Sequence, residues 1–170
     1  GWKLVEQNRS LIERVVAVAP GPPGNIQPEA NVIEETDDEV VVESFGMTRR
    51  LSRDRVYAGG IEFVRHKLIG KSTRFPEDAL EMYAGQVAGV PPRLLMERQN
   101  IGGSQLKIEN LSAFDGLKVL VFTGELDTDH PKDIDGAGVD WLADAGAKVE
   151  YWWLPDHGVG GNGHMLMMEE

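Results

Sequence analysis

Cysteine is absent from the 170 residues of this chain. The sequence therefore contains no disulfide, no thiolate metal site and no cysteine nucleophile of its own. Long apolar runs are also missing, since no stretch approaches the roughly 18 consecutive apolar residues that a transmembrane helix needs. Basic residues are few, with 17 Lys and Arg against 28 Asp and Glu and a formal net charge of -11. Because nucleic acids and anionic membranes attract basic surfaces, we expect neither as a partner.

The remaining composition is that of one globular domain. Hydrophobic residues make up 41% of the chain and charged residues 26%, and the length is sufficient to bury a core. Sequons at Asn8 and Asn110 would carry glycans only in a secreted protein, so they leave the compartment open. Helix-forming residues follow Gly1 without an initiator methionine or signal peptide, and the last residues stop without a helix cap. We interpret both ends as cut, in a fragment or in a processed enzyme that has a partner chain.

Apolar periodicity predicts alternating helices and strands near both ends of the chain. The expected helices cover 2–13, 76–88, 133–145 and a last helix that begins at His164, and the expected strands cover 15–19, 40–42, 118–123 and 148–154. Continuous apolar runs of this length are typical of buried parallel strands. We therefore predict an α/β fold in which residues 1–24 and 113–170 form a parallel sheet and residues 25–112 are a cap inserted between two core strands.

Two polar loops follow neighbouring strands of this predicted sheet. Residues 123–131 contain Asp127 and Asp129, and residues 156–164 contain His157 and His164. Ligands bind at the carboxyl ends of strands in open parallel sheets. A carboxylate there can accept the Nδ1 proton of a histidine and stabilise the imidazolium that forms when Nε2 takes a proton from a serine hydroxyl. The two loops therefore predict an acid–base pair.

Three segments resemble parts of the α/β-hydrolase superfamily. Residues 124–131 read G-E-L-D-T-D-H-P and resemble the G-x-x-D-x-x-x-P acid turn of many α/β-hydrolases. Residues 154–167 read L-P-D-H-G-V-G-G-N-G-H-M-L-M and are similar to the histidine loop L-P-x-x-G-V-x-G-N-S-H-M-M-M of a bacterial esterase subgroup. Residues 16–21, V-A-V-A-P-G, resemble the V-S-V-E-P-G strand end of that subgroup. The resemblance implies the C-terminal part of an α/β-hydrolase parallel sheet with an inserted cap between two core strands.

The resemblance also assigns roles to individual residues. His164 takes the place of the catalytic histidine. The subgroup has its acid Glu in V-E-P-G, where this chain has Ala19, so the acid must lie elsewhere. Asp127 fits the general acid turn of the superfamily, and Asp129 is the fallback. The chain order serine, acid, histidine is that of the α/β-hydrolases.

The nucleophile is not found in this sequence. No G-x-S-x-G elbow is present, because residues 102–105, G-G-S-Q, lack the second glycine and a preceding apolar strand. The resemblance places the nucleophilic serine and the oxyanion-hole donors before Gly1. We therefore expect this chain to be inactive alone. Its expected partners are the N-terminal portion of the same hydrolase, on a separate or a longer chain, and a small-molecule ester.

The implied reaction is hydrolysis of a carboxylic ester, lactone or amide through an acyl-enzyme, without a cofactor. Two alternatives stay open. An Asp or Cys nucleophile on the same fold would indicate a dehalogenase, epoxide hydrolase or dienelactone hydrolase. A non-catalytic binding module is the other alternative, in which Ala19 marks a site that has lost its acid.

Several side chains also have structural explanations. His157 is interpreted as a loop histidine and only secondarily as the functional one. A group of five side chains suggests a metal site, namely Asp127, Asp129, His130, Asp133 and Asp135. Its spacing lacks the glycine and terminal Glu of an EF-hand loop, and acidic residues at a helix N-terminus suit the helix dipole, so we expect no metal. Residues 165–168 are expected to form the buried face of the last helix. Aromatic residues of the insertion are expected in the cap core: Phe45, Tyr57, Phe63, Phe75 and Tyr83.

Overall fold

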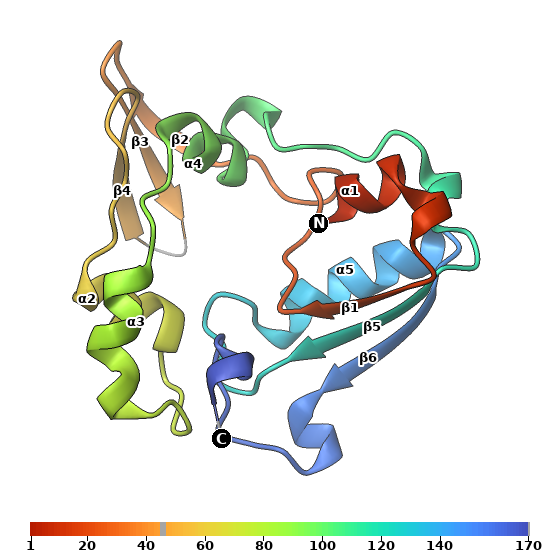
Figure 1. Cartoon of the computed structure of the whole chain (residues 1–170). Helices are drawn as coiled ribbons and strands as arrows, with labels where there is room; N and C mark the ends of the chain where they lie inside the picture. Colours follow the sequence, from red (N-terminus) through yellow and green to blue (C-terminus); the bar gives the residue numbers. More distant parts are fainter. Residues whose placement is uncertain (45–46, 170) are drawn as a thin grey trace.

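A three-stranded parallel sheet is the framework of the chain (Figure 1). The computed structural model describes residues 1–44 and 47–169, so Phe45 lies outside the described residues. The strands are β1 (Arg14–Val18), β5 (Lys118–Thr123) and β6 (Lys148–Trp153), in the order β1-β5-β6. Both pairings are parallel, with Val16 opposite Leu120 and Phe122 opposite Trp152. The structure therefore has the mixed α/β content that the sequence predicts.

One face of this sheet carries the main core. Helix α1 (Trp2–Gln7) and helix α5 (Lys132–Asp144) lie on the same side of the sheet in Figure 1. Between them and the strands, Phe114 is fully buried and its ring lies edge-on to Trp2 and Trp141, at centroid distances of 6.5 and 5.6 Å. The cluster of buried residues also includes Val5, Ala17, Leu117, Val119, Val121 and Leu142. Burial of these side chains holds both helices against the strands.

The opposite face of the sheet is open by comparison. Successive side chains of a strand point to opposite faces, so Val16 and Val18 point away from the core and are 60% and 37% exposed. Leu120 and Phe122 on the neighbouring strand are half-buried. Parallel sheets in globular proteins are covered on both faces in nearly all cases. This apolar face is therefore unusual for the class.

The chain between β1 and β5 forms a second, antiparallel sheet and a helical part. The sheet consists of β2 (Asn31–Glu35), β3 (Glu39–Ser44) and β4 (Met47–Ser52), and α4 (Pro92–Arg98) packs against its buried residues through Leu95 and Met96. Oppositely charged side chains pair across this sheet: Arg50 contacts Glu34 and Glu39, and Arg53 contacts Glu35. Surface pairs of this kind contribute little stability each.

The helical part of the insertion lies nearer the parallel sheet. It contains α2 (Ile61–Phe63), which continues into the π-helical turn η2 (Val64–Ile69), and α3 (Leu80–Gln86). Val64, Ile69 and Leu80 form its core. Of the aromatic residues expected in the insertion core, Phe63, Phe75 and Tyr83 pack against this cluster, whereas Tyr57 is 40% exposed. All three parallel strands point toward the side on which the insertion lies (Figure 1).

The predicted strands agree with the structure, but several predicted helices are shorter. The helix expected at 2–13 is α1, followed by the 3-10 turn Arg9–Leu11, and the helix expected at 76–88 is limited to α3 after the 3-10 turn Glu77–Ala79. In the part of the chain that the structure describes, no helix combines the length and the apolar composition that a membrane span requires.

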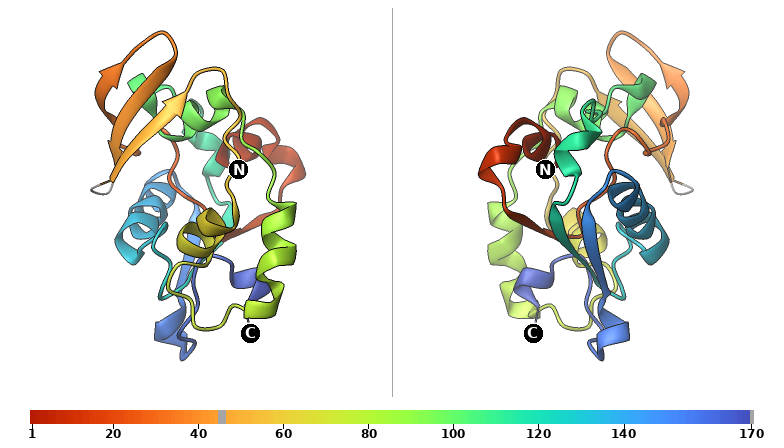
Figure 2. Two further views of the ribbon diagram at one scale, coloured as in Figure 1. Left: turned by 90° about the vertical axis from the view of Figure 1, so that its left-hand side faces the viewer. Right: turned by 90° about the vertical axis from the view of Figure 1, so that its right-hand side faces the viewer.

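The prediction of a helix that begins at His164 is wrong. The segment contains only the 3-10 turn Leu166–Met168, and Met167 is 70% exposed, so the methionines do not form a buried helix face. Local hydrogen bonds take the place of a helix: the Glu169 carboxylate accepts hydrogen bonds from the Gly163 N–H, at 3.0 and 2.9 Å, and from the Asn162 side chain. These contacts fold the end of the chain back on the glycine-rich loop. Both views of Figure 2 place this segment beside α3, where the Tyr83 hydroxyl donates to the sulfur of Met165.

Candidate functional site

The loops that follow β5 and β6 cross at the carboxyl ends of the parallel strands. The Leu126 N–H donates to the carbonyl of Asn162 at 2.8 Å. Gly124 makes the crossing possible, because a Cβ atom there would lie 2.4 Å from the carbonyl oxygen of Gly163. A real Cβ does not approach a backbone oxygen this closely, so the crossing requires glycine at position 124. The backbone thus brings the predicted acid loop against the predicted histidine loop.

Asp127 and His164 are hydrogen-bonded at this crossing. Oδ2 of Asp127 lies 2.9 Å from Nδ1 of His164. The other carboxylate oxygen, Oδ1, accepts the backbone N–H groups of Asp129 and His130 at 2.8 and 2.9 Å. The Asp127 side chain is fully buried, and the His164 side chain is 22% exposed. Three hydrogen bonds therefore fix the carboxylate, and its partner histidine keeps Nε2 for another group.

The environment of Asp127 favours its ionised form. Burial by itself raises the pKa of this carboxyl, but the hydrogen bond and charge of His164 and the two backbone N–H groups outweigh it, and the pKa lies below its ordinary value. An ionised carboxylate at Nδ1 holds the imidazole in the tautomer whose Nε2 is unprotonated. His164 can then accept a proton at Nε2, and Asp127 can stabilise the resulting imidazolium.

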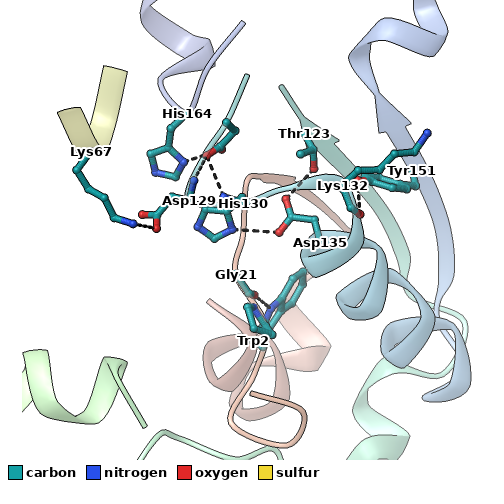
Figure 3. A network of polar contacts seen from close by, with 12 residues as sticks. Trp2, Gly21, Lys67, Thr123, Asp129, His130, Lys132, Asp135, Tyr151 and His164 are labelled. Atoms are coloured by element: carbon teal, nitrogen blue, oxygen red, sulfur yellow. Dashed lines mark hydrogen bonds and ion pairs between the residues drawn. The ribbon is translucent and has the colours of Figure 1, made fainter. Parts of the chain in front are cut away.

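A second histidine–aspartate pair lies beside the first (Figure 3). Nδ1 of His130 is 3.0 Å from Oδ1 of Asp135, and Oδ2 of Asp135 accepts a hydrogen bond from the Thr123 hydroxyl at 2.7 Å. Burial lowers the pKa of His130, but Asp135, followed by the charges of Asp127 and Asp129, raises it above the ordinary value. Asp135 belongs to the first turn of α5 and is buried.

The two imidazole rings are neighbours. Their centroids are 5.0 Å apart and their planes differ by 13°. His130 also fits closely against the loop after β1, since a Cβ at Gly21 would lie 3.1 Å from its Cε1 atom. The carbonyl of Gly21 accepts a hydrogen bond from the Trp2 indole at 3.2 Å (Figure 3). Helix α1 and the β1 loop thus support one side of the histidine pair.

Asp129, the fallback acid, faces a different partner. Its carboxylate forms an ion pair with Lys67 from the π-helical turn η2 of the insertion (Figure 3). Both side chains are largely buried, at 24% and 22% exposure. Turns of this rare type often occur at functional sites. The insertion therefore contributes a cation to the rim of the site, a residue that sequence reasoning did not identify.

The remaining candidates lie apart from this group or lack a functional side chain. His157 is exposed and stacks on Trp152, at a centroid distance of 4.4 Å and an interplanar angle of 18°. Ala19 directly follows β1, has a positive φ of 42° and is buried, and it offers no acid. His130 was considered only as part of a metal set. Its signal in the sequence is a histidine inside the G-x-x-D-x-x-x-P turn, five residues before a helix-start aspartate.

One ion could be shared by three side chains of the site. Single ligand atoms of Asp129, His130 and His164 all lie within 4.8 Å of one another. This group overlaps the metal set considered from the sequence in Asp129 and His130, but it adds His164 and does not include Asp133. The spacing of an EF-hand loop is no test of this group, because His164 comes from a loop far along the chain from Asp129 and His130.

A hollow of about 750 Å³ lies beside the histidine loop. Its lining includes Arg74 and Phe75 of the insertion, Glu125 of the acid loop and Gly161 of the histidine loop. The Gly161 N–H donates to the Glu125 carboxylate at 2.8 Å, and the Thr73 N–H donates to the Gly161 carbonyl at 2.9 Å. None of the residues of the two histidine–aspartate pairs lines this hollow.

Comparison with known proteins leaves the geometry as the main evidence. No family model matches the chain, and searches of curated proteins and of solved structures gave no significant match.

Proposed function

We propose that this chain supplies the acid–base half of the active site of a serine hydrolase with an α/β-hydrolase fold. In this proposal His164 is the general base and then the general acid, and Asp127 is the acid that orients it. The observation that carries the proposal is the 2.9 Å contact between His164 Nδ1 and the buried Asp127 carboxylate at the carboxyl ends of two parallel strands. The motif resemblance of both loops to hydrolase loops supports the same assignment.

The proposed reaction is hydrolysis of a carboxylic ester, or of a lactone or amide, through an acyl-enzyme. A serine hydroxyl transfers its proton to His164 Nε2 while its oxygen forms a bond to the carbonyl carbon. Asp127 stabilises the imidazolium, which then returns the proton to the leaving alcohol. Water repeats the sequence and releases the carboxylic acid. The insertion would act as the cap over the site, with Lys67 at its rim.

The open face and edge of the parallel sheet support a nucleophile on polypeptide that this sequence does not include. In the described residues β1 pairs only with β5, so its other edge has no strand beside it. Val16 and Val18 expose apolar surface on the face away from α1 and α5. A further strand beside β1, with its own covering helices, would satisfy both features. In an α/β-hydrolase such a strand ends at the nucleophile elbow.

A serine-reactive fluorophosphonate tests this proposal. We would treat the purified protein and record a denaturing intact-mass spectrum of every polypeptide in it. The expected result is one phosphonyl adduct on sequence outside these 170 residues, and loss of the adduct in a His164→Ala variant. No adduct on any species would contradict the serine mechanism. It would favour an Asp or Cys nucleophile on the same fold, or the non-catalytic module in which Ala19 marks the lost acid.

A further inference from the structure

We propose that Asp129, His130 and His164 bind a divalent transition-metal ion, with Zn²⁺ as the ion that their chemistry suits best. Two imidazole nitrogens and one carboxylate oxygen lie within 4.8 Å of one another. Two His and one carboxylate are a frequent ligand set for zinc, with a fourth position left for water or substrate. Imidazole ligands disfavour Ca²⁺ and Mg²⁺, which take oxygen ligands.

The hydrogen bonds of both histidines prepare the same nitrogen for the metal. Nδ1 of His164 is held by Asp127 and Nδ1 of His130 by Asp135, at 2.9 and 3.0 Å. Each ring therefore keeps Nε2 for coordination. Histidine ligands of metals in proteins almost always donate their other N–H to a carboxylate or carbonyl in this way. Finding the arrangement twice, on neighbouring rings, is the observation that carries the proposal.

The carboxylate of each histidine–aspartate pair is itself held by further hydrogen bonds. Asp135 accepts the Thr123 hydroxyl at 2.7 Å, and Asp127 accepts two backbone N–H groups. The side chains of Asp127 and Asp135 are fully buried. These contacts fix the direction of both rings before any ion arrives. Pre-orientation of ligands reduces the entropy lost on binding.

The charge around the two rings also suits a cation. The two ring planes differ by only 13°, and Figure 3 shows the rings beside one another with the Asp129 carboxylate next to them. Asp127, Asp129 and Asp135 face the histidines, and Lys67 is the cation paired with Asp129. Three carboxylates against one ammonium leave an excess of negative charge for a divalent ion to balance.

Metal binding and proton transfer would compete for His164. The site needs Nε2 of His164 as a ligand, and the proposed hydrolase needs the same atom as a base. Bound Zn²⁺ would therefore inhibit the hydrolase reversibly. This second consequence rests on the proposed function, whereas the binding of the ion does not.

Cobalt and zinc titrations of the purified protein test the site directly. Co²⁺ reports its ligand geometry through its visible d–d absorption, and Zn²⁺ displaces it. We expect saturable binding of one Co²⁺, displacement by Zn²⁺, and no displacement by an excess of Mg²⁺ or Ca²⁺. His130→Gln should weaken Co²⁺ affinity at least tenfold, since it removes one ligand of three. His157→Gln is the matched control, because His157 lies on the same loop as His164 but stacks on Trp152.

A further variant locates the ion within the cluster. Lys67→Met removes the ammonium next to Asp129 and should strengthen Co²⁺ binding, with circular dichroism confirming that each variant is folded. Equal affinity in the wild type and the His130→Gln variant would overturn the proposal, as would weaker binding in Lys67→Met. If the protein binds Co²⁺ as expected but takes no fluorophosphonate, the metal site stands and the serine hydrolase proposal fails.

Discussion

The buried carboxylate of Asp127 lies 2.9 Å from Nδ1 of His164, although the two residues are 37 positions apart in the chain. Two backbone N–H groups fix the carboxylate from its other side. A buried anion with three donors has little freedom to choose another partner. The pair is thus a rigid unit, and its chemistry can be tested by single-atom changes.

In the proposed hydrolase, measured together with the polypeptide that supplies the nucleophile, replacing Asp127 by Asn should abolish most of the esterase activity and leave the fold intact. The amide oxygen can still accept the backbone N–H groups, but the neutral side chain no longer stabilises an imidazolium and favours the wrong tautomer of His164. We expect kcat for an ester substrate to fall by roughly 10³–10⁴-fold with little change in KM.

Asp156→Asn is the matched control for that variant. Asp156 is exposed on the loop after β6 and contacts Lys132. Its kcat should equal that of the wild type. A full-strength Asp127→Asn enzyme would show that Asp127 is not the acid.

Alanine at position 124 should destabilise the protein, whereas alanine at position 136 should stabilise it. A Cβ at Gly124 would collide with the carbonyl oxygens of Gly163 and Asn162, at 2.4 and 2.8 Å, whereas a Cβ at Gly136 in α5 meets nothing within 4 Å. Gly124→Ala should lower the free energy of unfolding by about 1–3 kcal/mol, and Gly136→Ala should raise it by roughly 0.5–1 kcal/mol. Urea unfolding of both variants measures this. Equal stability of the two variants would mean that the loops do not cross as described.

Glu6 should make the stability of the protein depend on pH in the acidic range. Its carboxylate contacts Lys3 at 2.6 Å and accepts the N–H groups of Asn110 and Glu109 at 2.6 and 2.7 Å. These contacts lower its pKa from 4.5 to about 2. Because the folded pKa is the lower one, the stabilisation is complete above the unfolded value and is lost as the pH falls from 4.5 toward 2.

Glu6→Gln should therefore lower Tm at pH 7 and flatten the fall of Tm between pH 4.5 and 2. Thermal melts across this range measure the effect, and Glu13→Gln, at an exposed carboxylate nearby, should leave both quantities unchanged. An identical pH profile for the wild type and the Glu6→Gln variant would contradict the assignment.

Val16 offers a test of the open sheet face. If further polypeptide covers this face, as the proposed function requires, Val16→Asn should cost the intact protein about 2 kcal/mol or more of unfolding free energy. If the face is exposed to water, as in the described residues, the cost should stay within about 0.5 kcal/mol. Leu106→Asn, at a residue of the insertion that is 64% exposed, is the control. A small effect at Val16 would argue against the missing half of the sheet.

Local sequence was sufficient for the framework of the fold. The strands β1, β5 and β6 were predicted from short segments rich in Val, Phe, Tyr and Trp, because these residues fit the pleated, half-buried surface of a strand. The helix expected at 133–145 ends close to its expected position, because Gly146 adopts a φ of +89° directly after the C-cap residue Ala145. Conformations of this kind depend on one or two residues, so neighbours far along the chain do not alter them.

The sequence motifs also identified Asp127 and His164, but only the tertiary structure decided what surrounds them. His130 acquires its place from Asp135 and from the ring of His164, Asp129 is drawn to Lys67 of the insertion, and the last helix is replaced by a turn that Glu169 closes on Gly163. The contact of Asp129 with Lys67 and the contact between the two imidazole rings join segments far apart in the chain, whose approach depends on the packing of the whole chain. Local propensity contains no information about such approaches. Asp127 and His164, 37 positions apart, could be predicted as a pair because the motifs of both loops assigned a role to each residue. No motif assigned a role to His130 and Asp135, although only five positions separate them.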